Sequence, residues 1–67
     1  MSGMDAEKAG FIQGVGWAVN VLATRGDDVQ AGELIRESGL TAKDFRQAAV
    51  NEYDMKAVRK IKRSERV

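Results

Sequence analysis

The side chains that most often carry out enzyme chemistry are scarce in this sequence. Its 67 residues include neither cysteine nor histidine, which excludes the usual nucleophile–base pairs, disulfides and the common zinc sites. Asp27 and Asp28 adjoin, but the start of a helix explains both carboxylates. The tripeptide GVG at 14–16 lacks the third glycine and the preceding strand of a dinucleotide-binding fingerprint. We therefore expect a protein that is not an enzyme and that holds no cofactor or metal ion.

Positively charged side chains gather toward the C-terminal end. Residues 1–40 hold three basic and six acidic side chains, a net charge of −3, whereas residues 41–67 hold eight basic and four acidic ones, a net charge of +4. The stretch KAVRKIKRSER (56–66) predicts an amphipathic basic helix, and it contains no aromatic residue to stack on bases or to anchor in a bilayer. The candidate contacts to an anionic partner on this helix are Lys56, Arg59, Lys60 and Arg63.

A basic amphipathic helix suits several anionic surfaces. It can lie along a nucleic-acid backbone, an acidic protein surface or an anionic membrane. A terminal helix that only faces solvent has the same pattern. The pattern therefore allows both interpretations, a solvated helix and a partner-binding helix.

The segment ELIRESGLTAKDFRQAAV (33–50) reads as a helix, a glycine turn and a second helix. It resembles the helix-turn-helix of DNA-binding regulators, in which the second helix enters the major groove. In that interpretation Lys43, Arg46 and Gln47 read bases and contact phosphates, because Arg and Gln offer paired hydrogen-bonding groups to guanine and adenine. Ile35 is bulky for such a crossing, and Asp44 is negative on the DNA-facing side. We therefore favour a packed helical pair within a bundle.

A stripe of small and aromatic residues follows one face of the first predicted helix. Gly10, Gly14, Trp17 and Val21 recur at helical spacing. Small residues let another backbone approach closely, and tryptophan offers a large contact area. The stripe is either the second wall of the core or an interface with a partner protein or a second copy.

Four helices position these residues. The first is expected from Asp5 to Arg25 and the second from about Asp28 to Ser38, with Gly26 and Gly39 as their stops. The second helix is expected to begin with a capping box of Asp27 and Gln30. The third is expected to begin at Thr41, in a capping box with Asp44, and to end near Val50 or Asn51. The fourth is expected to begin at Asp54.

The fold class that follows is all-α: a compact small bundle of one long and three short helices, with a helix-turn-helix-like pair at about 28–50. Residues 1–67 form a single small domain, in which 1–4 and 64–67 are expected to fray. The expected core residues are Phe11, Val15, Leu22, Leu34, Phe45 and Ile61. The apolar run at 10–23 is too short for a transmembrane helix, which needs about 20 residues. We therefore expect a cytoplasmic protein without membrane association.

The overall type is similar to the small accessory proteins of bacteriophages and other mobile elements: one small helical domain without a cofactor or a catalytic set. Such proteins often bind a host machine and block it, or regulate a neighbouring operon. The resemblance implies a non-enzymatic interaction protein that inhibits or modulates a host complex in the host cytoplasm. Its most expected partner is a protein, and a homodimer is a further option. The alternative is a small helix-turn-helix transcriptional regulator that binds DNA.

Overall fold

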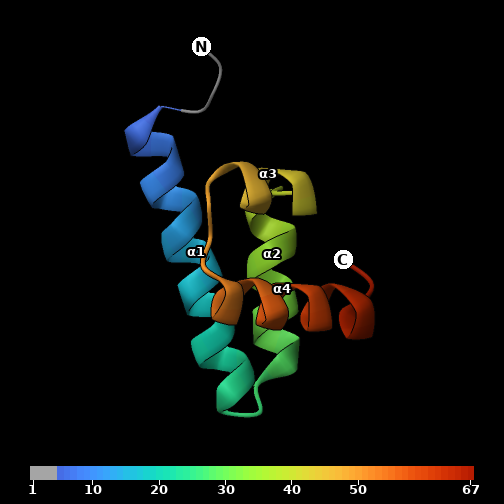
Figure 1. Cartoon of the computed structure of the whole chain (residues 1–67). Coiled ribbons are helices and arrows are strands. Elements are labelled where there is room, and N and C mark those ends of the chain that lie inside the picture. Colours follow the sequence, from blue (N-terminus) through green and yellow to red (C-terminus); the bar gives the residue numbers. More distant parts are fainter. Residues whose placement is uncertain (1–4) are drawn as a thin grey trace.

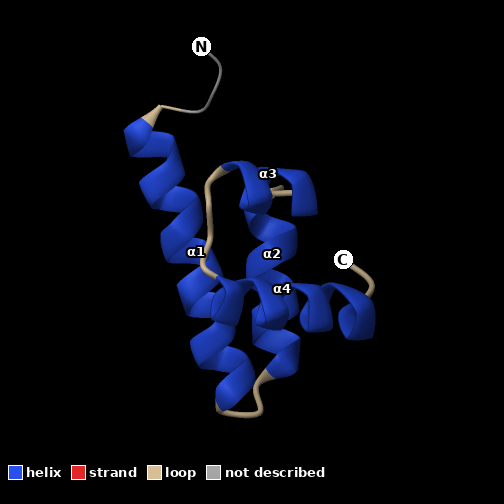
Figure 2. Ribbon diagram, in the orientation of Figure 1, coloured by secondary structure: helices blue, strands red, loops and turns tan. Residues whose placement is uncertain are grey.

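A computed structural model describes residues 5–67 of the chain. Within this range the secondary structure is helical, without a strand (Figure 2). The four helices are α1 (Ala6–Thr24), α2 (Asp28–Ser38), α3 (Ala42–Gln47) and α4 (Glu52–Glu65). The prediction of an all-α bundle with one long helix is confirmed. The expected fraying of residues 1–4 lies outside the described residues.

The first two helices form an antiparallel hairpin, and the last helix lies across both of its arms (Figure 1). A short turn joins α1 to α2, and in it Gly26 adopts a positive φ of 80° that few other residues tolerate. α3 lies at the end of the hairpin away from this turn. Residues 48–51 then return along α1 to the start of α4 (Figure 1).

The core lies where α1, α2 and α4 meet, and α3 adds one large side chain to it. The largest fully buried side chains are Phe45, Ile12, Ile35, Ile61, Val19 and Val58. Among the residues that we expected in the core, Val15, Phe45 and Ile61 are buried, whereas Leu22 and Leu34 are half-buried.

The expectation that Phe11 lies in the core is wrong, because its side chain is 61% exposed. The inward face of α1 contains Ile12 and Val19, so it is rotated by about one residue, or 100°, from the face that we expected. This rotation brings Gly16 to the inward face. Its missing side chain leaves room there for Val50, in the segment that leads into α4.

Two glycines are the places where α4 and its leading segment approach the hairpin. A Cβ added to Gly16 would lie 3.0 Å from Cγ1 of Val50, and one added to Gly32 would lie 2.8 Å from both Cβ and Cγ of Glu65. Such distances leave no space for a methyl group unless the neighbour moves. The close packing of α4 on α1 and α2 therefore depends on glycine at both positions.

The helix starts agree only in part with the expected caps. The capping box of Thr41 and Asp44 is present: the Asp44 N–H donates to Oγ1 of Thr41 over 3.2 Å, and the Thr41 N–H donates to Oδ2 of Asp44 over 2.8 Å. The second predicted box is wrong, because the side chain of Asp27 makes no capping hydrogen bond. The φ and ψ of Asp27, −99° and 62°, differ from the extended backbone of the other three N-caps.

The fourth helix begins earlier and ends later than we expected. Its N-cap is Asn51, whose side-chain oxygen accepts from the Asp54 N–H over 2.9 Å, so Asp54 lies in the first turn. α3 correspondingly ends at Gln47. At the other end, residues 64–67 differ from the expectation of fraying. α4 includes Ser64 and Glu65, and Val67 packs against the core.

None of the helices formed by residues 5–67 combines the length and the apolar character needed to cross a membrane.

Candidate interaction surfaces

A groove of about 530 Å³ runs between α1 and the segment that leads into α4. It is lined by Gly10, Gln13, Gly14, Trp17, Ala49, Val50, Asn51 and Asp54. Three of the four residues of the predicted glycine–tryptophan stripe therefore border one hollow. The fourth, Val21, is half-buried and lies outside the lining.

The α1 wall of the groove is open. A Cβ placed on Gly10 or on Gly14 would meet no atom within 4 Å. The side chain of Trp17 is 62% exposed. The interpretation of the stripe as a second wall of the core is therefore wrong. The stripe lies on the side of α1 away from Ile12 and Val19, because these residues already fill the face that α2 and α4 cover.

The opposite wall of the groove is tied to α1 by a polar contact. The side-chain amide of Gln13 donates to the carbonyl oxygen of Ala48 over 2.6 Å. The next residue, Ala49, has a positive φ of 58°, which is uncommon for a residue with a side chain. The chain therefore turns sharply at this point and continues beside α1.

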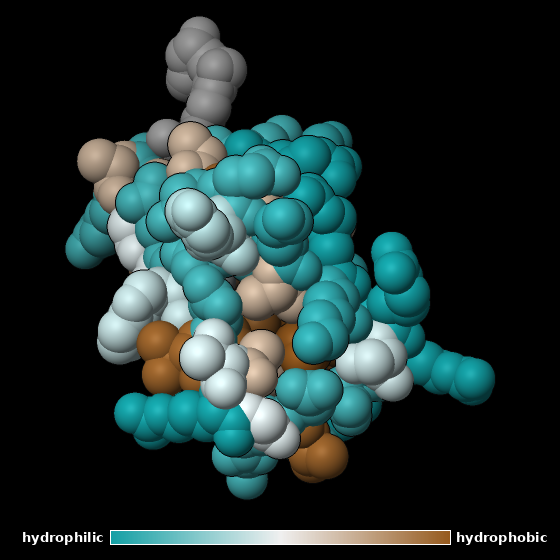
Figure 3. All heavy atoms as spheres, turned by 60° about the horizontal axis from the view of Figure 1, so that its bottom comes forward, coloured by the Kyte–Doolittle hydropathy of each residue, from teal (hydrophilic) through white to brown (hydrophobic). Residues whose placement is uncertain are grey.

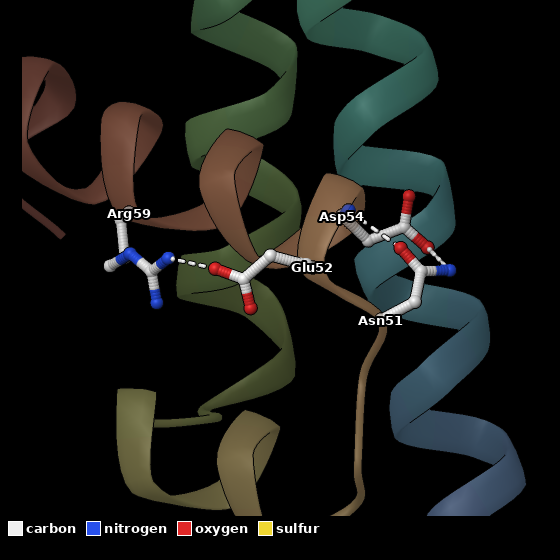
Figure 4. Close-up of polar contacts among 4 residues, drawn as sticks. All are labelled: Asn51, Glu52, Asp54 and Arg59. Atoms are coloured by element: carbon white, nitrogen blue, oxygen red, sulfur yellow. Dashed lines mark hydrogen bonds and ion pairs between the residues drawn. The ribbon is translucent and has the colours of Figure 1, made fainter.

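A buried carboxylate lies at the inner end of the groove. Asp54 is 6% exposed, and its Oδ1 accepts from the side-chain amide of Asn20 over 2.9 Å. Its Oδ2 accepts from the amide of Asn51 over 3.2 Å, as Figure 4 shows. The bond from Asn20 joins α1 to the first turn of α4, and the bond from Asn51 lies within the start of α4. They satisfy the buried carboxylate, which would otherwise be costly to place there.

The predicted basic face is present on α4. Lys56, Arg59, Lys60 and Arg63 are all exposed, on the side of the helix away from the core. Arg59 is held in an ion pair with Glu52, with 2.9 Å between Nη2 and Oε2 (Figure 4). Within residues 5–67 the other three cations have no ion pair. Three charges of this face are therefore free to meet an anionic partner.

Tyr53 belongs to the same helix and was not among the predicted site residues. Its side chain is 83% exposed, more than any other large hydrophobic residue of the described chain. Because α4 was expected to begin at Asp54, Tyr53 falls in the predicted linker before it. Its spacing of three residues before Lys56 was the available signal, because residues three apart are neighbours on a helix.

A second hollow, of about 390 Å³, lies between the ends of α2 and α4 and is basic. Arg36, Lys62 and Arg66 line it, and none of them was among our candidates. Two of the three are engaged: Arg36 pairs with Glu33 over 2.7 Å, and Nζ of Lys62 donates to the carbonyl oxygen of Val67 over 2.8 Å. The hollow adds to the positive charge around α4.

The predicted DNA-reading residues lie on a short helix. Lys43, Arg46 and Gln47 are exposed on α3, which has six residues. α3 packs against α1 and α4, and none of its Cα atoms lies within 8 Å of a Cα atom of α2. The helix–glycine–helix order at 28–50 is present, but its two helices do not approach each other closely. They therefore form neither a DNA-reading pair nor the closely packed pair that we favoured.

The surface around the α1–α2 turn is mostly hydrophilic, with hydrophobic atoms in small separate patches (Figure 3). The exposed large hydrophobic side chains of the described chain are Phe11, Trp17, Val29 and Tyr53. Among these, Trp17 alone borders the groove between α1 and the segment that leads into α4, which we call the α1 groove.

Comparison with known proteins gives no match to a protein family, to a curated protein or to a solved structure.

Proposed function

We propose that the protein is a non-enzymatic interaction protein that receives a segment of another protein in the α1 groove. The observation that carries the proposal is Trp17, which is 62% exposed beside a groove whose two glycines have open space above them. Tryptophan is enriched among the residues that dominate binding energy at protein interfaces. Covering Trp17 would remove a large apolar surface from water.

The two glycines of this groove support the same proposal. Glycine inside a helix costs about 0.5–1 kcal/mol relative to alanine. Packing within the described chain does not require glycine at Gly10 or Gly14, because a methyl group at either position would meet no neighbour. A partner backbone that lies directly on α1 would require glycine at these positions. This contrasts with Gly16 and Gly32, which the packing of the chain itself explains.

The biological role that we propose is that of a bacteriophage-type accessory protein. Such a protein binds a host complex in the cytoplasm and inhibits or modulates it. A second copy of the chain is the alternative occupant of the groove.

The test compares variants of the groove with a matched variant outside it. Gly14→Leu would place a side chain in the groove, and Trp17→Ala would remove its aromatic wall. Val29→Ala is the control, because Val29 is 65% exposed and lies outside the groove. Sedimentation first determines whether the chain self-associates. Affinity capture from nuclease-treated lysate then identifies a partner.

We expect Gly14→Leu and Trp17→Ala to weaken self-association or partner binding, while Val29→Ala keeps it. A monomeric protein whose captured partner binds Gly14→Leu as tightly as the wild type would contradict the proposal.

A second candidate function is the binding of an anionic macromolecule through α4. The observation that favours it is the exposure of Lys56, Lys60 and Arg63, which lack ion pairs among residues 5–67. The double charge reversal of Lys60 and Arg63 to Glu should lower the salt concentration at which the protein leaves a heparin column. Unchanged elution would remove this candidate.

A further inference from the structure

We propose that the exposed face of α4 binds single-stranded nucleic acid, with Tyr53 stacking on a base and the neighbouring cations contacting phosphates. This inference rests on the second candidate function above, which requires only an anionic partner. It adds the chemical class of that partner. It also adds Tyr53, a residue that the charge pattern alone does not identify.

The first argument is the arrangement of the four side chains on the helix. At 100° per residue, Tyr53, Lys56, Lys60 and Arg63 fall within an arc of about 80°. Along the axis, successive members of this set are about 4.5–6 Å apart, at 1.5 Å per residue. An aromatic ring and three cations therefore form one row along the helix. A hollow of about 320 Å³ lies beside Tyr53, lined by Glu52, Tyr53 and Lys56.

The second argument is that the row is fixed in place. The opposite side of α4 is buried through Met55, Val58 and Ile61, so the helix cannot rotate without opening the core. Glu52, a carboxylate beside the row, is paired with Arg59 (Figure 4). The pair reduces the repulsion that Glu52 would exert on phosphates.

The third argument selects single strands over other polyanions. Proteins that bind single strands without sequence preference combine a positive surface with aromatic side chains on which bases stack. In a duplex the bases stack on each other, and their faces are not available to a ring on a surface helix. An acidic protein or a sulfated polysaccharide offers charge without bases. Tyr53, at 83% exposure, presents a ring on which an unpaired base can stack.

The experiment measures fluorescence anisotropy of a labelled oligothymidine of about 20 nucleotides, longer than the sites of about 4–16 nucleotides typical of such surfaces. A duplex of equal length and heparin are the comparison ligands. The variants are Tyr53→Ala, Tyr53→Phe and Lys60→Glu. Lys43→Glu is the matched control, since it makes the same charge change on α3. All three positions are exposed, so the four variants should keep the fold.

We expect the single strand to bind more tightly than the duplex. Affinity should fall about 20-fold between about 50 and 200 mM salt, if three cations contact phosphates with a slope of about −0.7 each. Tyr53→Ala should weaken binding of the single strand at least about fivefold without changing elution from heparin, and Tyr53→Phe should keep wild-type affinity. Lys60→Glu should weaken binding more than Lys43→Glu.

Three outcomes would overturn the inference: no binding of the single strand at low salt, tighter binding of the duplex, or full affinity in Tyr53→Ala. If heparin binding still depends on Lys60 in any of these cases, the anionic-partner function stands and only the nucleic-acid assignment falls. Equal losses of affinity in Lys60→Glu and Lys43→Glu would also overturn the inference, because binding would then depend on the net charge of the protein and not on this face of α4.

Discussion

Gly32 of α2 lies directly beneath Glu65 of α4, so closely that a methyl group on Gly32 would lie 2.8 Å from two carbon atoms of that side chain. This contact joins the middle of the second helix to the last turn of the fourth. It is the counterpart of the contact between Gly16 and Val50 at the other end of α4. The two glycines set how closely the final helix approaches the hairpin.

The first prediction follows from this contrast between glycines. Gly32→Ala should lower the free energy of unfolding by about 1–2 kcal/mol, because the cost of overpacking exceeds the gain in helix propensity. Gly14→Ala is the matched control and should raise the free energy of unfolding by about 0.5–1 kcal/mol, since its methyl group enters open space. Urea denaturation measures both values. Equal effects of the two substitutions would contradict the described packing of α4.

The second prediction concerns the two phenylalanines of the chain. Phe45 is fully buried, so Phe45→Ala should cost roughly 3–5 kcal/mol and leave little stable protein. Phe11 is 61% exposed, so Phe11→Ala should change stability by less than about 0.5 kcal/mol. Thermal unfolding followed by circular dichroism distinguishes the two. A large loss in Phe11→Ala would mean that α1 is rotated toward the face that its hydrophobic pattern first indicated.

The third prediction is a dependence on acid pH that arises at the start of α3. The backbone N–H and the hydroxyl of Thr41 donate to the carboxylate of Asp44, which lowers the pKa of Asp44, and Lys8 and Lys43 lower it further. A carboxyl group with a lower pKa in the folded state stabilises the fold above its unfolded pKa of about 3.9. That contribution is lost as the pH falls through the folded-state pKa.

We therefore expect wild-type melting temperatures to fall more steeply than those of Asp44→Asn as the pH decreases below about 4. Thr41→Ser should keep the wild-type dependence, because serine retains the hydroxyl donor. Thr41→Ala should weaken it and should also cost about 0.5–2 kcal/mol at neutral pH through the lost cap. Parallel pH profiles of the wild type and Asp44→Asn would show that this contact does not contribute.

The fourth prediction concerns the backbone turn at Ala49, where φ is 58°. β-branched residues adopt this conformation poorly, so Ala49→Val should lower the free energy of unfolding by about 1–3 kcal/mol. Ala49→Gly relieves the conformation, so it should be more stable than Ala49→Val by at least the same amount. Ala49 is exposed, so lost packing does not explain such a difference. Equal denaturation midpoints of the two variants would argue against the turn.

The features that sequence reasoning identified are those that depend on near neighbours. The stops at Gly26 and Gly39 and the cap formed by Thr41 and Asp44 involve residues within one helical turn, and all of them are present. The start of α4 was misplaced because Asn51 and Asp54 are both good capping residues. That error of three residues left Tyr53 in a linker and hid its place beside the basic residues.

The rotation of α1 could not be predicted, because it depends on a distant segment. Apolar residues occupy more than half of the circumference of this helix, so its pattern allows more than one inward face. With Ile12 facing inward, Gly16 also faces inward and contacts Val50, a residue 34 positions later in the chain. The same rotation places the glycine–tryptophan stripe outside the core. The groove itself arises only when residues 49–51 lie beside α1.

The position of α4 across both arms of the hairpin also bears on how the chain is made. Synthesis proceeds from the N-terminus, and domains generally fold as units. The hairpin of α1 and α2 therefore emerges from the ribosome before the helix that covers Ile12, Val19 and Ile35 emerges. Its apolar side faces water until residues 52–65 emerge. A truncated chain that lacks residues 52–65 exposes this uncovered hydrophobic surface to chaperones and proteases, and it carries neither the completed groove nor the basic face.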